Sequence, residues 1–170
     1  MLVCGSLRRG SVNTAVLETV RQVAPPAVHP HLYQGLGGLP HFNPDDDNET
    51  VDSRVADLRG QLAAADAVLF STPEYAGELP GSFKNLLDWT VGGGLYRKPV
   101  GWINSSPLGA ADTYASLRRV LGYVNADIVE AACADIPVLR TDIEEGSVKT
   151  ERPRAEITAV VAALIRHVAA

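Results

Sequence analysis

The stretch Ala67–Trp89, AVLFSTPEYAGELPGSFKNLLDW, predicts a strand, a loop and a helix in succession, and the rest of the fold is expected to surround it. Its apolar start, Ala67–Phe70, is typical of a strand buried on both faces of a parallel sheet. A loop over residues 71–81 follows, and an amphipathic helix is expected over residues 82–91. The loop contains Pro73, Gly77, Pro80 and Gly81, which specify its backbone path. Because ligands of parallel sheets bind outside the carboxyl ends of the strands, this loop is the first candidate for a site. The alternative is an ordinary connection between a strand and a helix.

Composition indicates one globular domain that spans residues 1–170. The chain has 170 residues, of which 46% are hydrophobic, and this is enough for a full core. Its formal net charge is −5, and no Lys/Arg cluster stands out beyond the pairs Arg8-Arg9 and Arg118-Arg119. This pattern argues against nucleic acid or a membrane surface as the main partner.

The two cysteines, Cys4 and Cys133, lie far apart in the sequence and form no CxxC motif. They indicate neither a disulfide framework nor a zinc site, and we expect both to be small buried residues in a reducing compartment. The chain shows no basic segment followed by an apolar stretch at its start, and no apolar run reaches ~18 residues. We therefore expect a soluble, cytoplasmic protein.

Strand and helix patterns alternate along the whole chain, which predicts an α/β fold with helices on both faces of a parallel sheet. Five strands suit the doubly wound, flavodoxin-like order 2-1-3-4-5. The expected strands are Met1–Cys4, Val28–Tyr33, Ala67–Phe70, Pro99–Asn104 and Ala126–Ala131, and the expected helices cover residues 12–24, 49–65, 82–91, 112–124 and 152–168. Residues 135–146 are expected to be irregular. In this order the loops after strands one, three and four meet at one edge of the sheet.

The first of these loops, residues 5–13, leads from a strand into the N-terminus of a helix that Ser11 can cap. Free backbone N–H groups and the helix dipole make such a position suitable for an anion. Ser6 and Ser11 offer hydroxyl groups, Asn13 offers an amide, and Arg8 offers a guanidinium that matches phosphate oxygens. The loop is neither GxxxxGK[ST] nor GxGxxG, so a single terminal phosphate fits better than a triphosphate or a dinucleotide. A simple helix cap beside a surface arginine is the alternative.

The other two loops supply the surroundings of a flat ring. In residues 72–81, Tyr75 could cover a ring, and backbone N–H groups near Gly77 could reach ring heteroatoms. Residues 104–109 add the small hydroxyl groups of Ser105 and Ser106, and Gly109 permits close approach of the backbone. Together the three loops describe a phosphate pocket joined to a slot for a planar ring.

These motifs resemble those of the NADPH-dependent FMN reductase family. Gly5-Ser6-Leu7-Arg8 with Ser11-Val12-Asn13 resembles its phosphate loop, and its second signature is matched by Pro73-Glu74-Tyr75, Leu79-Pro80-Gly81, Lys84-Asn85 and Asp88-Trp89. The resemblance implies a flavodoxin-like fold and an oxidoreductase that binds FMN. It also implies that NADPH or NADH donates a hydride, and that two electrons then pass to a quinone, free flavin, an azo dye or a metal oxyanion. Members are typically homodimers or homotetramers.

The three loops and the resemblance together indicate a set of cofactor-binding residues. Because the cofactor carries the chemistry, we name no catalytic acid or base, and we assign no metal site. The set is Ser6, Arg8, Ser11, Val12, Asn13, Pro73, Glu74, Tyr75, Ala76, Gly77, Ser105, Ser106 and Gly109. The recurrence of Lys84, Asn85, Asp88 and Trp89 is interpreted as packing, capping or a subunit interface.

Two features depart from the family pattern. Ala76 stands where the family has Asn, which removes an amide near the flavin edge and affects the expected range of acceptors. The first strand has four residues before Gly5 where members have more, so either this strand is truncated or the true start lies upstream.

The remaining polar patterns have plainer interpretations. Asp45–Asp47 with Glu49 could suggest a metal site, but a solvated loop before a helix is the favoured interpretation because EF-hand spacing is absent. No histidine and glutamate have zinc-hydrolase spacing, and no GxSxG motif occurs. The alternative function is a flavodoxin-type electron carrier that serves a protein partner, and a flavin-free regulator with the same fold is a third hypothesis.

Overall fold

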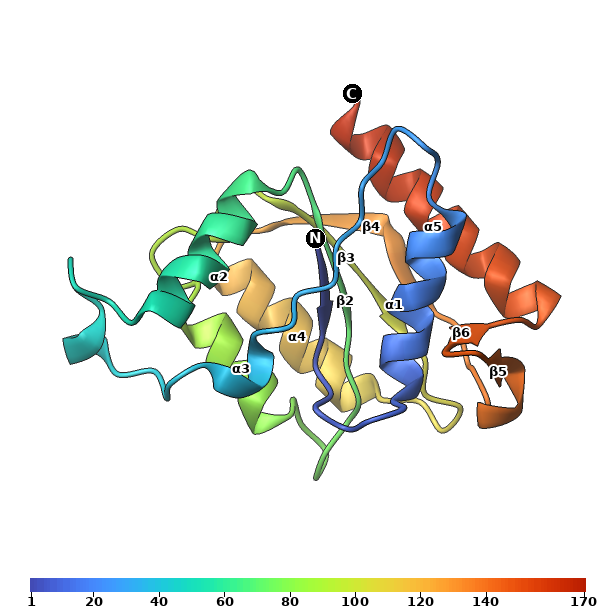
Figure 1. The fold of residues 1–170 in the computed structure, drawn as a ribbon, viewed down its shortest axis with the longest axis horizontal. Helices are drawn as coiled ribbons and strands as arrows, with labels where there is room; N and C mark the ends of the chain where they lie inside the picture. Colours follow the sequence, from blue (N-terminus) through green and yellow to red (C-terminus); the bar gives the residue numbers. More distant parts are fainter.

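The computed structural model describes all residues, 1–170, and its centre is a four-stranded parallel sheet. The strands follow the order β1-β2-β3-β4, and helices cover both faces of the sheet (Figure 1). The strands are β1 (Leu2–Cys4), β2 (Val68–Ser71), β3 (Pro99–Asn104) and β4 (Asp127–Asp135). The helices are α1 (Val12–Val23), α2 (Ser53–Ala64), α3 (Gly81–Asp88), α4 (Ala111–Tyr123) and α5 (Glu151–Val168). Short 3₁₀ turns occur at Leu36–Gly38, Pro44–Asp46 and Arg140–Asp142.

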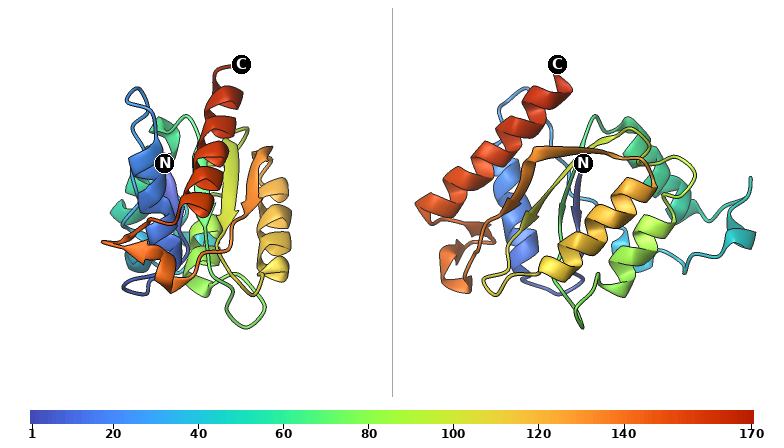
Figure 2. Two further views of the ribbon diagram at one scale, coloured as in Figure 1. Left: turned by 90° about the vertical axis from the view of Figure 1, so that its right-hand side faces the viewer. Right: turned by 180° about the vertical axis from the view of Figure 1, so that it is seen from behind.

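The sheet separates two hydrophobic cores because successive strand residues point to opposite faces. In β2, Val68 and Phe70 pack with α2, α3 and α4, whereas Leu69 packs with α1 and α5. The two layers of helices are seen on either side of the sheet in Figure 2. All four residues of β2 are buried, as predicted for a central strand of a parallel sheet.

The predicted strand at residues 28–33 is reduced to one parallel bridge, between Leu32 and Leu2. The segment lies beside β1, where the order 2-1-3-4-5 puts it, but the sheet has four strands and not five. Two hydrogen bonds hold it, from the Leu2 N–H to the His31 carbonyl and from the Tyr33 N–H to the Leu2 carbonyl. Pro30 has no N–H to give to a ladder, and a three-residue β1 offers few partners, so pairing goes no further.

The edge strand β4 is longer than predicted and is interrupted by a bulge. Its register with β3 jumps from Val100–Ile128 to Trp102–Cys133. Gly101 lies at this shift, where a Cβ would come 2.5 Å from the Ala132 carbonyl oxygen, so only glycine fits. The segment after β4, expected to be irregular, contains the first strand of a small antiparallel hairpin, β5 (Ile143–Glu144) and β6 (Ser147–Val148). No helix is both long enough and apolar enough to cross a bilayer.

Candidate functional site

The three loops predicted to converge do so around one cavity of about 530 Å³. They follow β1, β2 and β3 and lie at the lower edge of the sheet in Figure 1. The lining residues are Ser6, Arg8, Ser11, Val12, Asn13, Thr72, Pro73, Glu74, Tyr75, Ser105, Ser106, Pro107, Leu108, Gly109 and Val138. All of the predicted cofactor-binding residues are among them except Ala76 and Gly77.

The loop between β1 and α1 presents unpaired donors to this cavity. Ser11 is the N-cap residue of α1, as predicted, but its buried side chain makes no capping hydrogen bond. The hydroxyl group and the first N–H groups of the helix therefore remain available to an anion. Arg8 is exposed and forms none of the ion pairs found in the structure, so its charge is not neutralised by a carboxylate.

Gly5 allows this loop to lie directly against the loop after β2. A Cβ at Gly5 would lie 2.1 Å from Thr72 Oγ1, which is far inside van der Waals contact. The Gly5 N–H also donates to the Ser71 carbonyl at 2.9 Å. The absence of a side chain at Gly5 thus allows the first and second loops to lie side by side, and the backbone hydrogen bond holds them there.

Asn13 connects all three strand ends. Its side chain is 7% exposed, and its Oδ1 accepts hydrogen bonds from Ser71 Oγ at 2.9 Å and from Ser105 Oγ at 3.1 Å. Asn13 also lines the cavity, and its Nδ2 group makes no hydrogen bond within the protein and is not among the buried unpaired atoms. Asn13 therefore fixes the geometry of the site and offers it a donor at the same time.

The loop after β2 turns sharply at Tyr75–Glu78. The Tyr75 and Glu78 backbones exchange two hydrogen bonds, of 3.0 and 3.1 Å, around a two-residue tip. The tip residues have positive φ, 52° at Ala76 and 75° at Gly77, as in a type I′ turn. Such a turn favours Asn-Gly, so the family's Asn in place of Ala76 has a conformational explanation. Ala76 and Gly77 form this tip and do not line the cavity, whereas Tyr75 stands at its rim with half of its surface exposed.

The loop after β3 is shaped by Asn104, whose side chain is buried. Asn104 Oδ1 accepts from the Ser106 N–H at 3.1 Å, and Asn104 Nδ2 donates to Asp135 Oδ1 at 2.8 Å. These contacts direct Ser105 and Ser106 to the cavity wall, and Gly109 closes the loop with φ of 83°. No motif in the sequence indicates Val138, which lies after β4 and reaches the cavity through a hydrogen bond from its N–H to the Ser105 carbonyl. Thr72, Pro107 and Leu108 also line the cavity but were not among the predicted binding residues.

Neither cysteine has the properties of a nucleophile. Cys4 lies at the end of β1, where its Sγ is 3.3 Å from Thr14 Oγ1, and burial raises the pKa of its thiol. Cys133 is half-buried, and burial raises the pKa of its thiol to about 11. Both thiols are free and remain protonated near neutral pH, whereas the nucleophilic form of cysteine is the thiolate.

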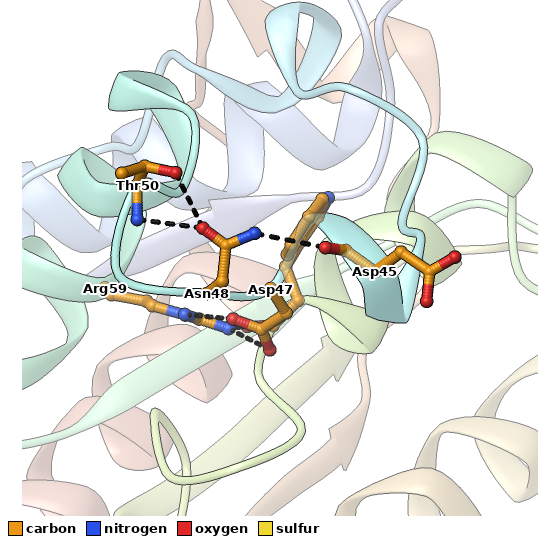
Figure 3. Close-up of polar contacts among 6 residues, drawn as sticks. Asp45, Asp47, Asn48, Thr50 and Arg59 are labelled. Carbon is orange, nitrogen blue, oxygen red and sulfur yellow. Dashed lines mark hydrogen bonds and ion pairs between the residues drawn. The ribbon is translucent and has the colours of Figure 1, made fainter.

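The acidic run at residues 45–49 forms a polar network with its own loop and with α2 (Figure 3). Both oxygens of Asp47 accept from the guanidinium of Arg59, at 2.8 and 2.9 Å, and this contact lowers the pKa of Asp47. Arg59 also donates to the Trp89 carbonyl. The Asn48 side chain donates to the Asp45 carbonyl and accepts from the N–H and hydroxyl groups of Thr50. No group of three or more His, Cys, Asp or Glu side chains is arranged to hold a metal ion.

The Lys84-Asn85 and Asp88-Trp89 motif has a structural explanation on α3. Asn85 accepts from the Phe42 N–H at 2.8 Å and donates to the Pro40 carbonyl at 2.8 Å. Trp89 Nε1 donates to the same carbonyl at 2.9 Å, and Lys84 pairs with Asp88 at 2.6 Å. The motif therefore anchors the long loop before α2, in agreement with the packing interpretation.

A second cavity, of about 570 Å³, lies at the opposite, amino-terminal end of the sheet. Fourteen of its nineteen lining residues are hydrophobic, and most of the lining comes from residues 27–31, from residues 64–69 and from α5. It has no glycine-rich turn and no free helix N-terminus. The cavity at the carboxyl ends of the strands is therefore the candidate functional site.

Comparisons with known proteins show which family this chain is similar to. The family model for NADPH-dependent FMN reductase matches residues 1–136. A quinone reductase of Escherichia coli is 32% identical over 131 residues, which cover 74% of this chain and 70% of that protein. An NAD(P)H-dependent FMN reductase of Pseudomonas aeruginosa is 39% identical over 87 residues, which cover 51% of this chain but only 46% of that protein. Among solved structures, the flavoenzyme NAD(P)H:(acceptor) oxidoreductase FerB of Paracoccus denitrificans superimposes with a TM-score of 0.78 at 28% identity, covering 98% of this chain and 96% of that one.

Proposed function

The chain belongs to the NADPH-dependent FMN reductase family, and from this premise we propose that its strand-end cavity binds FMN for electron transfer from NADPH or NADH to a small acceptor. The observation that carries the proposal is the set of unpaired donors at the N-terminus of α1, beside a slot bordered by the loops after β2 and β3. A volume of about 530 Å³ lies within the usual ~300–1,000 Å³ range of ligand pockets.

The phosphate of FMN would be held at the N-terminus of α1. Arg8 supplies an unneutralised charge, Ser6 and Ser11 supply hydroxyl groups, and Asn13 supplies its Nδ2 group. Charge-assisted hydrogen bonds of this kind are roughly twice as strong as neutral ones. One phosphate accounts for these donors without the pyrophosphate motif that FAD or a dinucleotide would use.

The ring would lie between Pro73–Tyr75 on one side and Ser105, Ser106 and Gly109 on the other. When bound, FMN supplies the redox chemistry, with a hydride accepted from the nicotinamide and two electrons passed on. The protein's own residues would bind and orient the ring, and the exposed Tyr75 borders the side from which a nicotinamide would approach. No side chain in the cavity is assigned as a catalytic acid or base.

A quinone is the acceptor class that the relatives' names support, and free flavin, an azo dye or a metal oxyanion are the other candidates. We also propose a homodimer or a homotetramer. Leu7, Tyr75 and Leu108 expose large apolar side chains around the cavity, which suits a site completed by a second copy. A cytoplasmic location is part of the proposal and agrees with two free thiols.

The experiment is an absorbance titration of the purified protein with FMN, followed by anaerobic mixing with NADPH or NADH. We expect the protein to bind FMN in preference to FAD, and either nucleotide alone to bleach the oxidised-flavin band rapidly. Light scattering on the same sample gives the oligomeric state. Slow bleaching with both nucleotides would instead favour an electron carrier that needs a partner reductase. Failure to take up FMN would overturn the proposal.

A further inference from the structure

The first turn of α4 contacts the loop after β2 at two points. The Thr113 N–H donates to Glu74 Oε2 at 3.2 Å, and the Tyr114 hydroxyl lies within hydrogen-bond distance of both backbone groups of Thr72. Ala110, the N-cap residue of α4, has no side chain that could cap the helix. Glu74 therefore supplies the acceptor that the side chain of an N-cap residue would otherwise provide, and this contact links its loop to the helix.

The Tyr114 hydroxyl joins this loop to the end of β3 as well. It accepts from the Thr72 N–H at 3.1 Å, and it lies 2.9 Å from the Ile103 carbonyl oxygen, to which it can donate. Its ring packs against Trp102, with centroids 6.0 Å apart, and the side chain is 7% exposed. Burial raises the pKa of the hydroxyl, so it stays protonated and can donate and accept at once.

These contacts matter for the slot because the same turn of α4 directly follows the third loop. Gly109 lines the cavity on one side of the slot, and Thr72 and Glu74 line it on the other. Without the Tyr114 hydroxyl, the Thr72 N–H would be left buried with no partner, since Thr72 is almost fully inaccessible. A buried unpaired donor is costly, so the loop would move to satisfy it.

We propose that Tyr114 is a positioning residue for the flavin ring: its hydroxyl, together with the Glu74–Thr113 contact, sets the separation of the two loops that border the ring slot. This inference rests on the proposed function but concerns only the ring half of the site. Tyr114 itself does not line the cavity and acts through Thr72.

The test uses Tyr114→Phe, which removes the hydroxyl and keeps the ring packed on Trp102. The matched control is Tyr123→Phe on the same helix, because Tyr123 is 89% exposed and makes no side-chain hydrogen bond. We expect Tyr114→Phe to weaken binding of both FMN and riboflavin about 10-fold, as loss of a buried hydrogen bond predicts. At saturating FMN, bleaching by NADH should also slow several-fold, because the ring is held less precisely.

Riboflavin separates the ring from the phosphate half of the site, since it has no phosphate. Arg8→Ala should weaken FMN binding and leave riboflavin binding unchanged, whereas Tyr114→Phe should affect both. A general loss of stability would not reproduce this pattern in protein that is shown to be folded and saturated with flavin.

Glu74 provides a second test should Tyr114→Phe fail to fold. Glu74→Gln keeps an acceptor for the Thr113 N–H, so it should lose less riboflavin affinity than Glu74→Ala. Equal losses for the two Glu74 variants, or equal behaviour of Tyr114→Phe and Tyr123→Phe, would overturn the inference while wild-type protein still binds FMN. Wild-type protein that takes up no FMN would overturn the proposed function, and this inference with it.

Discussion

The Asn13 side-chain oxygen accepts a hydrogen bond from the Ser71 hydroxyl at 2.9 Å, and this contact joins the first turn of α1 to the end of β2. A second hydroxyl, from Ser105 at the end of β3, reaches the same oxygen. One buried amide thus holds together the three loops around the cavity. A fully connected polar network of this kind specifies one arrangement of the elements that it joins.

Asn13→Asp tests the part of this network that faces the cavity. The carboxylate keeps an acceptor for both serine hydroxyl groups, but it replaces the Nδ2 donor by a negative charge at an anion site. We expect FMN affinity to fall by more than about 100-fold, corresponding to roughly 3 kcal/mol or more, because a donor is lost and repulsion is added. Isothermal titration with FMN measures this effect. Riboflavin affinity should change far less, and equal losses for both ligands would contradict a phosphate contact by Asn13.

Arg8→Ala tests the charge of the phosphate loop. A charge-assisted contact contributes about 1.5–3 kcal/mol, so FMN should bind roughly 10- to 100-fold more weakly. Thermal unfolding of the flavin-free protein should be unchanged, because Arg8 is exposed and pairs with no carboxylate.

The neighbouring Arg9→Ala is the control for this substitution. Arg9 is also exposed but does not line the cavity. We expect it to alter FMN affinity only slightly. If the two variants behaved alike, Arg8 would not be a specific phosphate ligand.

Replacing glycine by alanine should change stability in opposite directions at Gly77, in the turn at Tyr75–Glu78, and at Gly60, in α2. Gly77→Ala puts a Cβ at φ of 75°, and a left-handed conformation costs an alanine about 1–2 kcal/mol. Gly60→Ala lies in the exposed middle of α2 with open space around it, and it should stabilise the protein by about 0.5–1 kcal/mol. Urea unfolding of the flavin-free variants gives both values, and equal signs would contradict the turn geometry.

Ala76→Asn tests the same turn with a substitution that should stabilise the protein. Ala76 has φ of 52°, a conformation that Asn adopts more readily than Ala. We expect Ala76→Asn to raise the free energy of unfolding by about 0.5 kcal/mol. FMN binding should change little, because the side chain at this position lies outside the cavity.

Much of the fold and the site could be predicted because each signal was local. The apolar run at the start of β2, the capping position of Ser11 and the glycines of the loops act within a few residues. The sequence places Gly5 at the end of a strand and the start of the phosphate loop, but the need for glycine there comes from a contact with Thr72, which is distant in the sequence. The strand expected at residues 28–33 forms only one bridge for a related reason. Its pairing depends on a distant segment, the short β1, as well as on the local effect of Pro30.

The contacts of α4 show where sequence reasoning ended. Tyr114 shares the buried face of α4 with Leu117 and Leu121, and its spacing in the sequence indicates no more than that. Its hydroxyl contacts backbone groups of Thr72 and Ile103, which no spacing rule connects to it. Glu74 likewise was assigned to the flavin, whereas the structure also gives it the free N-terminus of α4. Side-chain contacts to the backbone of distant segments require the fold before they can be named.

The anchor of the long loop on α3 gives the last prediction. Asn85 exchanges hydrogen bonds with Phe42 and Pro40, and Trp89 shares the Pro40 carbonyl. Asn85→Ala leaves the partly buried Phe42 N–H unpaired, so the free energy of unfolding should fall by about 2 kcal/mol. Asn48→Ala is the control, because Asn48 is exposed and bonds only within its own loop (Figure 3), and it should cost at most about 0.5 kcal/mol. Urea unfolding of both variants measures the difference. FMN affinity of folded Asn85→Ala should stay close to that of the wild type, because Asn85 does not line the cavity, and a large loss would give this motif a direct part in the site.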